Sequence, residues 1–384
     1  MNFRKPVLAA VLSFAAPVLV VLTGCGANPS GSSALATTTP NVPVGPQLIT
    51  VSGFWASAVN SATNMVYDLG NDNTMQVVDG SKNVVVASVT LGSVPYALAV
   101  NSATNMIYVS TPNSSSVTVI DGATNSIVAT VPDADGPGNV AVNPITNTVY
   151  VTNNDASTMT VINGATNTST ATVKTGSGYS ALAVNTLTDT VYVSSEITGT
   201  LTVVNGATNA VAATVQVGAY PLSVAVNPVT NTVYVSNSNS SSLSVVNGRT
   251  NTLTATVQVG GLPGNVAVNS VTNAVFVANI SGGTLSVING ATNAVDATVQ
   301  TGSYPLGVKV NSTTNTVYVS DYTGNSVTVI DGATNTATAT IPVIVSPESV
   351  SINADANMIY VAAHAGGSVS VINGATNTVA ATIK

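Results

Sequence analysis

The sequence Val203-Val204-Asn205-Gly206-Ala207-Thr208-Asn209, together with the largely apolar residues 210–217 that follow it, determines how this chain folds. Its Asn-Gly pair, or Asp-Gly in its place, recurs at intervals of 42 residues. The first residues of the eight pairs are Asp79, Asp121, Asn163, Asn205, Asn247, Asn289, Asp331 and Asn373. Eight copies at one fixed period of this length indicate a repeat architecture.

The Asn-Gly pair predicts a tight turn between two β-strands. Asn-Gly and Asp-Gly accept the positive φ angles of hairpin turns, and the Thr and Asn that follow are expected to close a five-residue loop. On either side lie short runs rich in Val, Ile, Thr and Ala, such as residues 117–120 and 129–131. These runs have the length of strands and no helical periodicity, so the repeat is predicted to be a β-hairpin.

A second hairpin shares the period and begins at an asparagine in each unit. That asparagine is Asn60, Asn101, Asn143, Asn185, Asn227, Asn269, Asn311 or Asn353, and only the first interval differs, at 41 residues. One unit is therefore predicted to hold strand A (residues 224–226), strand B (232–235), strand C (243–246) and strand D (253–259). A spacing of about ten residues per strand is typical of antiparallel all-β packing.

The units are predicted to close into a ring. Strand A often reads as consecutive apolar residues, such as Val266-Ala267-Val268, which indicates a sheet buried on both faces. A four-stranded unit buries both faces between two neighbours, as in a β-propeller. An open stack is the alternative, but neither end unit is more polar than the others. We expect one all-β domain with eight blades, and seven blades plus a displaced copy is the alternative.

Residues 1–24 are predicted to be a signal peptide. Arg4 and Lys5 precede an apolar run at residues 7–22 that is short for a transmembrane span. The run ends at Leu22-Thr23-Gly24-Cys25, which resembles the lipobox of bacterial lipoproteins, where the cysteine becomes the lipid-bearing N-terminus. The resemblance implies export and a lipid anchor at the bacterial cell envelope, at the outer membrane or cell surface. An ordinary secretory signal is the alternative.

Three segments follow from this order. After the signal peptide, residues 25–46 are small and polar with four prolines, as in a flexible tether that carries the lipid anchor. Residues 47–384 show no break in composition and form the propeller of eight 42-residue repeats. Cys25 is the single cysteine, so the chain forms no intramolecular disulfide despite export.

The repeat resembles a known family at Tyr150-Val151-Thr152-Asn153 and at its variants in the other units. These residues are similar to the YVTN-family β-propeller repeat, and the resemblance covers residues 48–384. It implies a propeller of the kind found in exported, surface-layer-like proteins. Tyr67-Asp68-Leu69 and Phe276 depart from the motif, so strand B is expected to be less regular in those two units.

The two faces of such a ring are expected to differ. The A–B and C–D turns lie on one face, here called the turn face, and their sameness follows from turn chemistry. The B–C and D–A loops lie on the other, here called the variable face, where the units differ and recognition is expected. The candidate binding residues there are Trp55, Tyr96, Tyr179, Tyr220, Tyr304, Tyr322, Asp155, Glu196, Asp321 and His364.

Aromatic rings beside carboxylates suit a polypeptide, a glycan or a cationic partner. The alternative for any single residue is structural, because an aromatic side chain can fill the space between blades and a loop acid can simply be solvated. Asp133 and Asp135 have the spacing of the start of a Ca²⁺ loop, but the third ligand and the later Glu of an EF-hand are missing. No metal site and no cofactor are therefore predicted.

Few side chains suit catalysis. With one histidine, His364, and one cysteine, no zinc set, haem ligation or Ser-His-Asp triad can be assembled. Asp155, Glu196 and Asp321 leave open a hydrolase that uses paired carboxylates. Beyond Cys25 the chain has five Lys and Arg against fourteen Asp and Glu, so no nucleic-acid partner is expected.

Lys309 stands out within the scaffold. It takes a strand A position that holds Ala in six of the eight units and Ser351 in the remaining one. Strand A is innermost in a propeller, so its ammonium is expected to reach toward the axial channel. Either the stem packs and the head meets channel water, or an anion binds there.

These observations favour a non-enzymatic, lipid-anchored propeller whose variable face binds a protein, peptide or glycan. A carboxylate-dependent hydrolase or lactonase-like enzyme is one alternative. A structural component of the cell envelope or surface layer is the other, because a charged fraction of only 5% permits self-association.

Overall fold

The computed structural model describes residues 54–384 apart from residues 71, 134, 179 and 365–367. Residues Thr50–Lys384 form one compact unit. The predicted signal peptide, the lipidation site Cys25 and the tether lie outside the described residues. The same holds for Tyr179 and for the side chain of Trp55, so what was predicted for all of these stays a prediction.

Within the described residues, eight four-stranded antiparallel sheets follow one another, each built from four consecutive strands. Blade 1 consists of β1 (Phe54–Asn60), β2 (Met65–Gly70), β3 (Thr74–Asp79) and β4 (Val84–Thr90). Blade 2 consists of β5 (Ala97–Asn101), β6 (Met106–Thr111), β7 (Ser116–Asp121) and β8 (Ser126–Pro132). Blade 3 consists of β9 (Pro137–Asn143), β10 (Thr148–Asn153), β11 (Thr158–Asn163) and β12 (Thr168–Lys174). Blade 4 consists of β13 (Leu182–Asn185), β14 (Thr190–Ser195), β15 (Thr200–Asn205) and β16 (Ala210–Gln216).

The second half of the ring repeats this arrangement. Blade 5 consists of β17 (Pro221–Asn227), β18 (Thr232–Asn237), β19 (Ser242–Asn247) and β20 (Thr252–Gln258). Blade 6 consists of β21 (Pro263–Asn269), β22 (Ala274–Asn279), β23 (Thr284–Asn289) and β24 (Ala294–Gln300). Blade 7 consists of β25 (Pro305–Asn311), β26 (Thr316–Asp321), β27 (Ser326–Asp331) and β28 (Thr336–Pro342). Blade 8 consists of β29 (Pro347–Asn353), β30 (Met358–Ala363), β31 (Val369–Asn373) and β32 (Thr378–Ile383), and the short 3-10 helices η2 (Pro112–Ser114) and η3 (Ser238–Ser240) lie in B–C loops.

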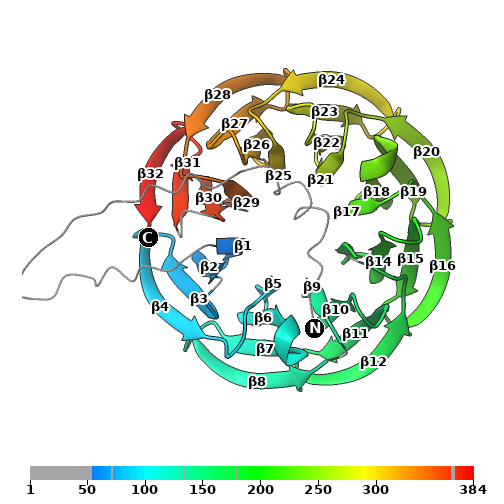
Figure 1. The fold of residues 1–384 in the computed structure, drawn as a ribbon, viewed down its shortest axis with the longest axis vertical. Helices are drawn as coiled ribbons and strands as arrows, with labels where there is room; N and C mark the ends of the chain where they lie inside the picture. The colour runs from blue at the N-terminus through cyan, green and yellow to red at the C-terminus, as the bar shows by residue number, and fades with distance from the viewer. Residues whose placement is uncertain (1–53, 71, 134, 179, 365–367) are drawn as a thin grey trace, which may run out of the picture. The chain divides into compact units, whose positions relative to one another are not determined.

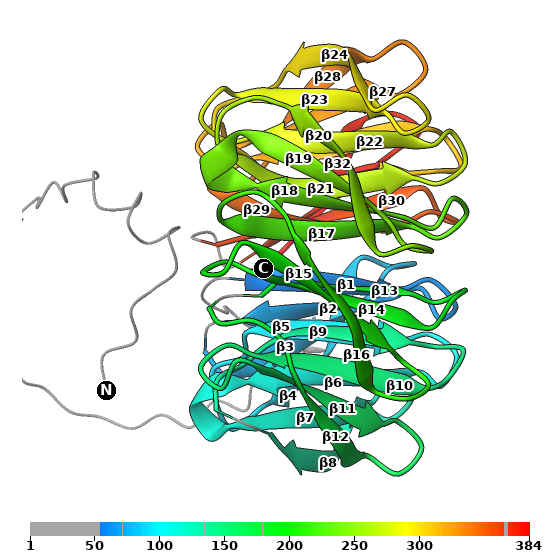
Figure 2. The same cartoon turned by 90° about the vertical axis from the view of Figure 1, so that its right-hand side faces the viewer.

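The blades form a closed ring. Figure 1 shows the first strand of each blade innermost and the fourth outermost. First strands of neighbouring blades contact each other all the way round, and β1 contacts β29 and β30 of the last blade. The predicted eight-bladed β-propeller is therefore confirmed, and the seven-bladed and open-stack alternatives are wrong. Seen from the side, the loops lie at two opposite faces of the ring (Figure 2).

The core lies between blades. Tyr192 on β14 is fully buried and packs against Val233 and Val246 of the next blade. Val193, the next residue along the strand, points the opposite way and packs with Tyr150 of the preceding blade. The Tyr-Val pair of the repeat therefore fills both interfaces of its blade, because alternate strand residues point to opposite faces. Strand B stays regular in the two departing units, since β2 and β22 pair along their lengths.

A ring of side-chain amides joins the blades on the turn face. Asn227, at the end of strand A, donates from Nδ2 to Oδ1 of Asn273 in the next blade at 2.7 Å. The equivalent bond occurs at all eight interfaces, with distances of 2.6–2.8 Å. Between blades 3 and 4 the acceptor is Asp189 instead of Asn. The bond from Asn353 to Asn64 links the last blade to the first and completes the ring.

The Asn-Gly turn has a different conformation from the one expected. Asn205 pairs with Ala210, so the loop has four residues between paired positions, and the residue with positive φ is Asn209, not Gly206. The amide of Asn209 donates to the carbonyl of Asn205 at 2.8 Å. An asparagine tolerates this left-handed conformation better than most residues. The same position is left-handed in all eight C–D turns.

Gly206 is needed because the neighbouring turn leaves no room for a side chain at this position. Its amide donates to the carbonyl of Asp189 in the adjacent A–B turn at 2.7 Å. A Cβ atom on Gly206 would lie 2.5 Å from Oδ1 and 2.7 Å from the backbone oxygen of Asp189. The glycine therefore lets two turns of one blade meet, and it lies beside the acceptor of the inter-blade amide bond.

Asp68 is the exception in the core. It takes the strand B position that is Val in the other seven blades, and it is fully buried where blade 1 meets blade 8. Neither carboxylate oxygen has a hydrogen-bond partner among the described residues, and Oε1 of its cross-strand neighbour Gln76 has none either. Burial raises the pKa of Asp68 to about 8. Burial, with smaller contributions from Asp68 and Asp79, raises the pKa of Tyr360 in blade 8 to about 12.

We expect Gly206→Ala to lower the free energy of unfolding by about 1–3 kcal/mol, because the new methyl group displaces the A–B turn from its packed position. Urea denaturation followed by far-UV circular dichroism measures the change. Gly282→Ala is the matched control, because Gly282 is exposed and a Cβ there meets no atom closer than 3.3 Å. Equal stabilities of the two variants would contradict the proposed role of the glycine.

We expect Asp68→Asn to stabilise the protein, and more so as pH rises. The folded pKa of Asp68 lies above its unfolded value, so the folded state holds the extra proton between about pH 4 and pH 8. Over that window the group lowers wild-type stability by about 1.4 kcal/mol per pH unit as pH rises. Denaturation of both proteins at pH 4, 6 and 8 checks this. Parallel pH profiles would show that the carboxyl is ionised in the fold.

Candidate functional site

The loops of the variable face are held together by one repeated hydrogen bond. The carbonyl of the residue before strand A accepts from the first amide of the B–C loop in the same blade. Tyr220 accepts from Ser238 at 2.9 Å, Tyr304 accepts from Tyr322 at 2.9 Å, and Ser346 accepts from His364 at 3.0 Å. This bond places each D–A residue beside a B–C residue, so the two kinds of loop form one surface.

The accepting residues have strained backbones. Tyr220, Leu262, Tyr304 and Ser346 have φ between 49° and 60°, and each precedes a proline. Such a conformation costs a non-glycine residue roughly 1–2 kcal/mol. The two tyrosines are therefore held in fixed positions at the inner end of the variable face instead of moving with a free loop.

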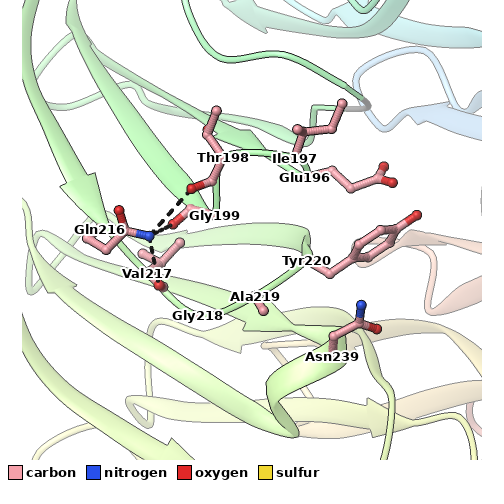
Figure 3. A pocket seen from close by; sticks show the side chains of 10 residues that line it. All are labelled: Glu196, Ile197, Thr198, Gly199, Gln216, Val217, Gly218, Ala219, Tyr220 and Asn239. Atoms are coloured by element: carbon pink, nitrogen blue, oxygen red, sulfur yellow. Dashed lines mark hydrogen bonds between the residues drawn. The ribbon is translucent and has the colours of Figure 1, made fainter.

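Glu196 and Tyr220 line one cleft, as Figure 3 shows. The cleft has a volume of about 400 Å³ and lies between the B–C loops of blades 4 and 5, with the D–A connection beneath them. Glu196 and Tyr220 point to the same side of it, and Asn239 lines it from the B–C loop of blade 5. Gln216 closes the outer end, where its Nε2 donates to the carbonyl of Gly199 at 2.7 Å.

A second cleft of about 370 Å³ lies one blade earlier. It is lined by the B–C loop at residues 156–158, by Lys174 and the D–A connection, and by Thr198 of the next blade. Lys174 gives this cleft a positive charge where the neighbouring cleft has Glu196. Consecutive inter-blade clefts of the variable face therefore differ in charge while sharing one backbone design.

Blades 7 and 8 bring four more side chains together. The rings of Tyr304 and Tyr322 have centroids 5.8 Å apart, and the imidazole of His364 lies 6.5 Å from Tyr322. Nδ1 of His364 is 3.0 Å from Oε2 of Glu348, and both side chains are partly exposed, at 32% and 20%. Burial, followed by the neighbouring Glu348, raises the pKa of Tyr322, while a hydrogen bond from Ser346 opposes this. The three rings of Tyr304, Tyr322 and His364, together with Glu348, are here called the aromatic row.

Asp321 is not on the binding surface. It was expected there, but it is fully buried at the end of β26, where Oδ2 accepts from Ser326 at 2.9 Å and from Thr328 at 2.8 Å. Burial raises its pKa. The equivalent Asn237 and Asn279 bind hydroxyl groups at the same positions, so Asp321 fills a structural site of the repeat.

The remaining predicted residues lie apart from these groups. Tyr96 and Asp155 are exposed on loops of blades 2 and 3. Asp133 accepts from the hydroxyl of Thr160, and Asp135 is exposed. Among the described residues, no group of three or more His, Cys, Asp or Glu side chains is placed to hold a metal ion.

The turn face carries a feature that turn chemistry does not explain. Ile145, Leu187, Val229 and Val271 occupy equivalent positions in the A–B turns of blades 3–6 and are 66–77% exposed. In the other blades that position holds Ala, Thr or Asp. Aligning the repeats would have revealed this series of aliphatic residues, because they recur at the 42-residue period.

The comparisons with known proteins support the fold. No family model matches the chain, and no curated protein matches it. The chain is similar to hydrazine synthase of Kuenenia stuttgartiensis, with a TM-score of 0.61 and 15% identity over 87% of this chain and 99% of that one. It is similar to dihydro-haem d1 dehydrogenase NirN in complex with DHE, with a TM-score of 0.67 and 15% identity over 89% of this chain and 75% of that one.

A functionally unknown protein from Desulfotomaculum acetoxidans DSM 771 gives a TM-score of 0.57 and 14% identity, over 75% of this chain and 95% of that one. At these identities the likeness shows the fold alone. The chain is an eight-bladed β-propeller with clefts between the loops of its variable face. No helix among the described residues is long and apolar enough to cross a membrane.

Proposed function

We propose that the protein is a non-enzymatic, lipid-anchored binding module whose variable face recognises a polypeptide or a glycan outside the cytoplasm. The observation that carries the proposal is the cleft of about 400 Å³ lined by Glu196, Tyr220 and Asn239. An aromatic face, a carboxylate and an amide in one cleft supply stacking and directed hydrogen bonds, which suit a sugar ring or a peptide side chain.

The aromatic row gives the same face a second contact region. Tyr304 and Tyr322 present tilted rings, and Tyr304 has the same fixed left-handed backbone as Tyr220. Rigid aromatic side chains lose little conformational entropy on binding, which favours them as anchor residues. Two anchored regions on one face suit an extended partner that contacts several blades.

Export and anchoring rest on the sequence Leu22-Thr23-Gly24-Cys25 and on the uncharged stretch that follows it. We propose that lipid on Cys25 holds the propeller at the bacterial cell envelope, with residues 25–46 as the tether.

A hydrolase is the second candidate, favoured by the aromatic row. A carboxylate bonded to a histidine is the arrangement that orients a general base, and His364 lies 3.0 Å from Glu348. Hydrolysis of an ester or lactone that disappears in both Glu348→Gln and His364→Gln would support this candidate over the binding module.

We expect Tyr220→Ala and Glu196→Gln each to weaken partner binding by about 2 kcal/mol or more, roughly 30-fold, as residues that fill a cleft do in other interfaces. Glycan arrays and pull-downs from envelope extracts with the purified propeller measure the binding. Val229→Ala is the matched control, because Val229 is exposed on the turn face. Binding that persists in both variants but is lost in the control would place recognition on the turn face.

We expect Cys25→Ala to move the protein from the membrane fraction to the soluble extracytoplasmic fraction, because the substitution removes the atom that carries the lipid. Fractionation and mass spectrometry of the mature N-terminus measure this. A wild-type N-terminus without lipid would contradict the proposed anchor.

A further inference from the structure

We propose that the two adjacent clefts of the variable face bind one extended polypeptide, with a basic side chain in the cleft of Glu196 and an acidic side chain beside Lys174. This proposal rests on the binding function above and narrows its partner to a polypeptide that carries both charges. The clefts measure about 400 and 370 Å³, within the range of specific binding sites.

Each cleft contains one charge. Glu196 is the single charged residue that lines the first cleft, and Lys174 is the single charged residue that lines the second. Glu196 is partly exposed and Lys174 is exposed, so a partner can reach both. Among the described residues, Lys174 forms no ion pair, and Asp155 of the adjoining B–C loop does not line the cleft. Each cleft is therefore expected to attract the opposite charge.

Lys309, the other lysine that the sequence singled out, is not part of this surface. It is paired with Tyr318 in β25 and β26, on the side of blade 7 that packs against blade 8. Its expected reach into the axial channel stays a prediction.

A ridge of two residues, Ile197 and Thr198, joins the clefts. Thr198 lines both clefts, and Ile197 lines the first. The amide of Ile197 donates to the carbonyl of Ser177, a residue that lines the second cleft, at 3.4 Å. The two clefts are therefore contiguous, and one chain that crosses the ridge enters both.

The ridge is apolar and held in place. The side chain of Ile197 is 72% exposed, although it packs on Gly178, where a Cβ atom would lie 2.8 Å from Cγ1 of the isoleucine. Oγ of Ser195 donates to the carbonyl of Ser177 at 2.6 Å, and Oγ1 of Thr198 donates to Ser195 at 2.7 Å. Because these bonds order the ridge before a partner arrives, little conformational entropy is lost there on binding. The exposed isoleucine suits an apolar residue between the two charges of the partner.

The two charges lie at different distances from the axis. Lys174 ends β12, the outermost strand of blade 3 (Figure 1). It takes the position that Gln216 takes one 42-residue period later, at the outer end of the first cleft. Glu196 follows β14, the second strand of blade 4, and so lies nearer the axis. A bound chain that meets both charges therefore crosses the ridge obliquely.

This arrangement fits a polypeptide better than a glycan. An extended polypeptide presents basic, apolar and acidic side chains at short intervals along one backbone. A neutral glycan carries neither charge, and an acidic glycan supplies no cation for Glu196. The ring of Tyr220, which lines the same cleft as Glu196, adds a face on which a lysine or arginine can stack.

The probe is a phage-displayed library of random linear peptides, selected on the immobilised full-length protein. We expect the enriched sequences to carry a basic and an acidic residue on either side of an apolar one. One enriched peptide is then synthesised together with a version in which its basic and acidic residues exchange places. The wild-type protein should bind the first peptide about tenfold more tightly in fluorescence anisotropy titrations, and added salt should reduce this preference.

A double variant exchanges the charges of the protein at constant net charge. Glu196→Lys combined with Lys174→Glu should prefer the charge-exchanged peptide about as strongly as the wild type prefers the original. Arg249→Glu combined with Asp296→Lys is the matched control, because both residues are exposed outside the variable face. The control should bind both peptides as the wild type does. Circular dichroism verifies that each variant is folded.

Two milder variants remove one charge each. Glu196→Gln and Lys174→Met should each reduce the tenfold preference to about threefold. The inference fails if the double variant keeps the preference of the wild type, or if selection enriches no peptide with both charges. Glycan binding that is lost in Tyr220→Ala would then leave the binding function standing with another class of partner. Absence of any binding that depends on Tyr220 would contradict the binding function itself.

Discussion

The whole molecule depends on the way each blade holds the next, and the side-chain amide at the end of strand A is the directional part of that contact. Apolar packing between blades is strong, but it does not fix the position of one blade along the next. The bond from Asn227 to Asn273 does, because its donor and acceptor are both buried or part-buried and neither has water as an easy substitute. The same bond occurs at every interface, and the one from Asn353 to Asn64 joins the last blade to the first.

That constraint also explains why one face is uniform. An acceptor such as Asn231 must be left-handed, must offer its carbonyl to Gly248 at 2.8 Å, and must accept an amide from Asn185 at 2.8 Å. Few residues meet three requirements, so the turns hardly vary. The loops at the other face share one backbone bond, in which the D–A residue accepts from the B–C loop, and their remaining hydrogen bonds differ from blade to blade. Their side chains are left free to differ, and clefts of opposite charge lie next to each other there.

The architecture was predictable because it rests on period and alternation, which are properties of the sequence. The 42-residue period predicted the number of blades, and the consecutive apolar residues of strand A predicted that the blades close into a ring. The reason for the glycine was not predictable, since Gly206 is constrained by Asp189, a residue of another turn. Asp321 looked like a loop acid, but Ser326 and Thr328 hold it inside the blade. The recurring Asn at that position was a usable signal. The contact of His364 with Glu348 depends on side-chain rotamers that no pattern encodes.

Among the described residues, each sheet is built from four consecutive strands, and the first and last blades exchange no strand. That junction is made by the same kinds of contact as the other seven, among them the amide bond from Asn353 to Asn64. Duplication or deletion of one 42-residue segment therefore adds or removes a complete sheet without rethreading any other. A gene built from such segments can lengthen in steps of one sheet, and its ends can be moved to any boundary between sheets.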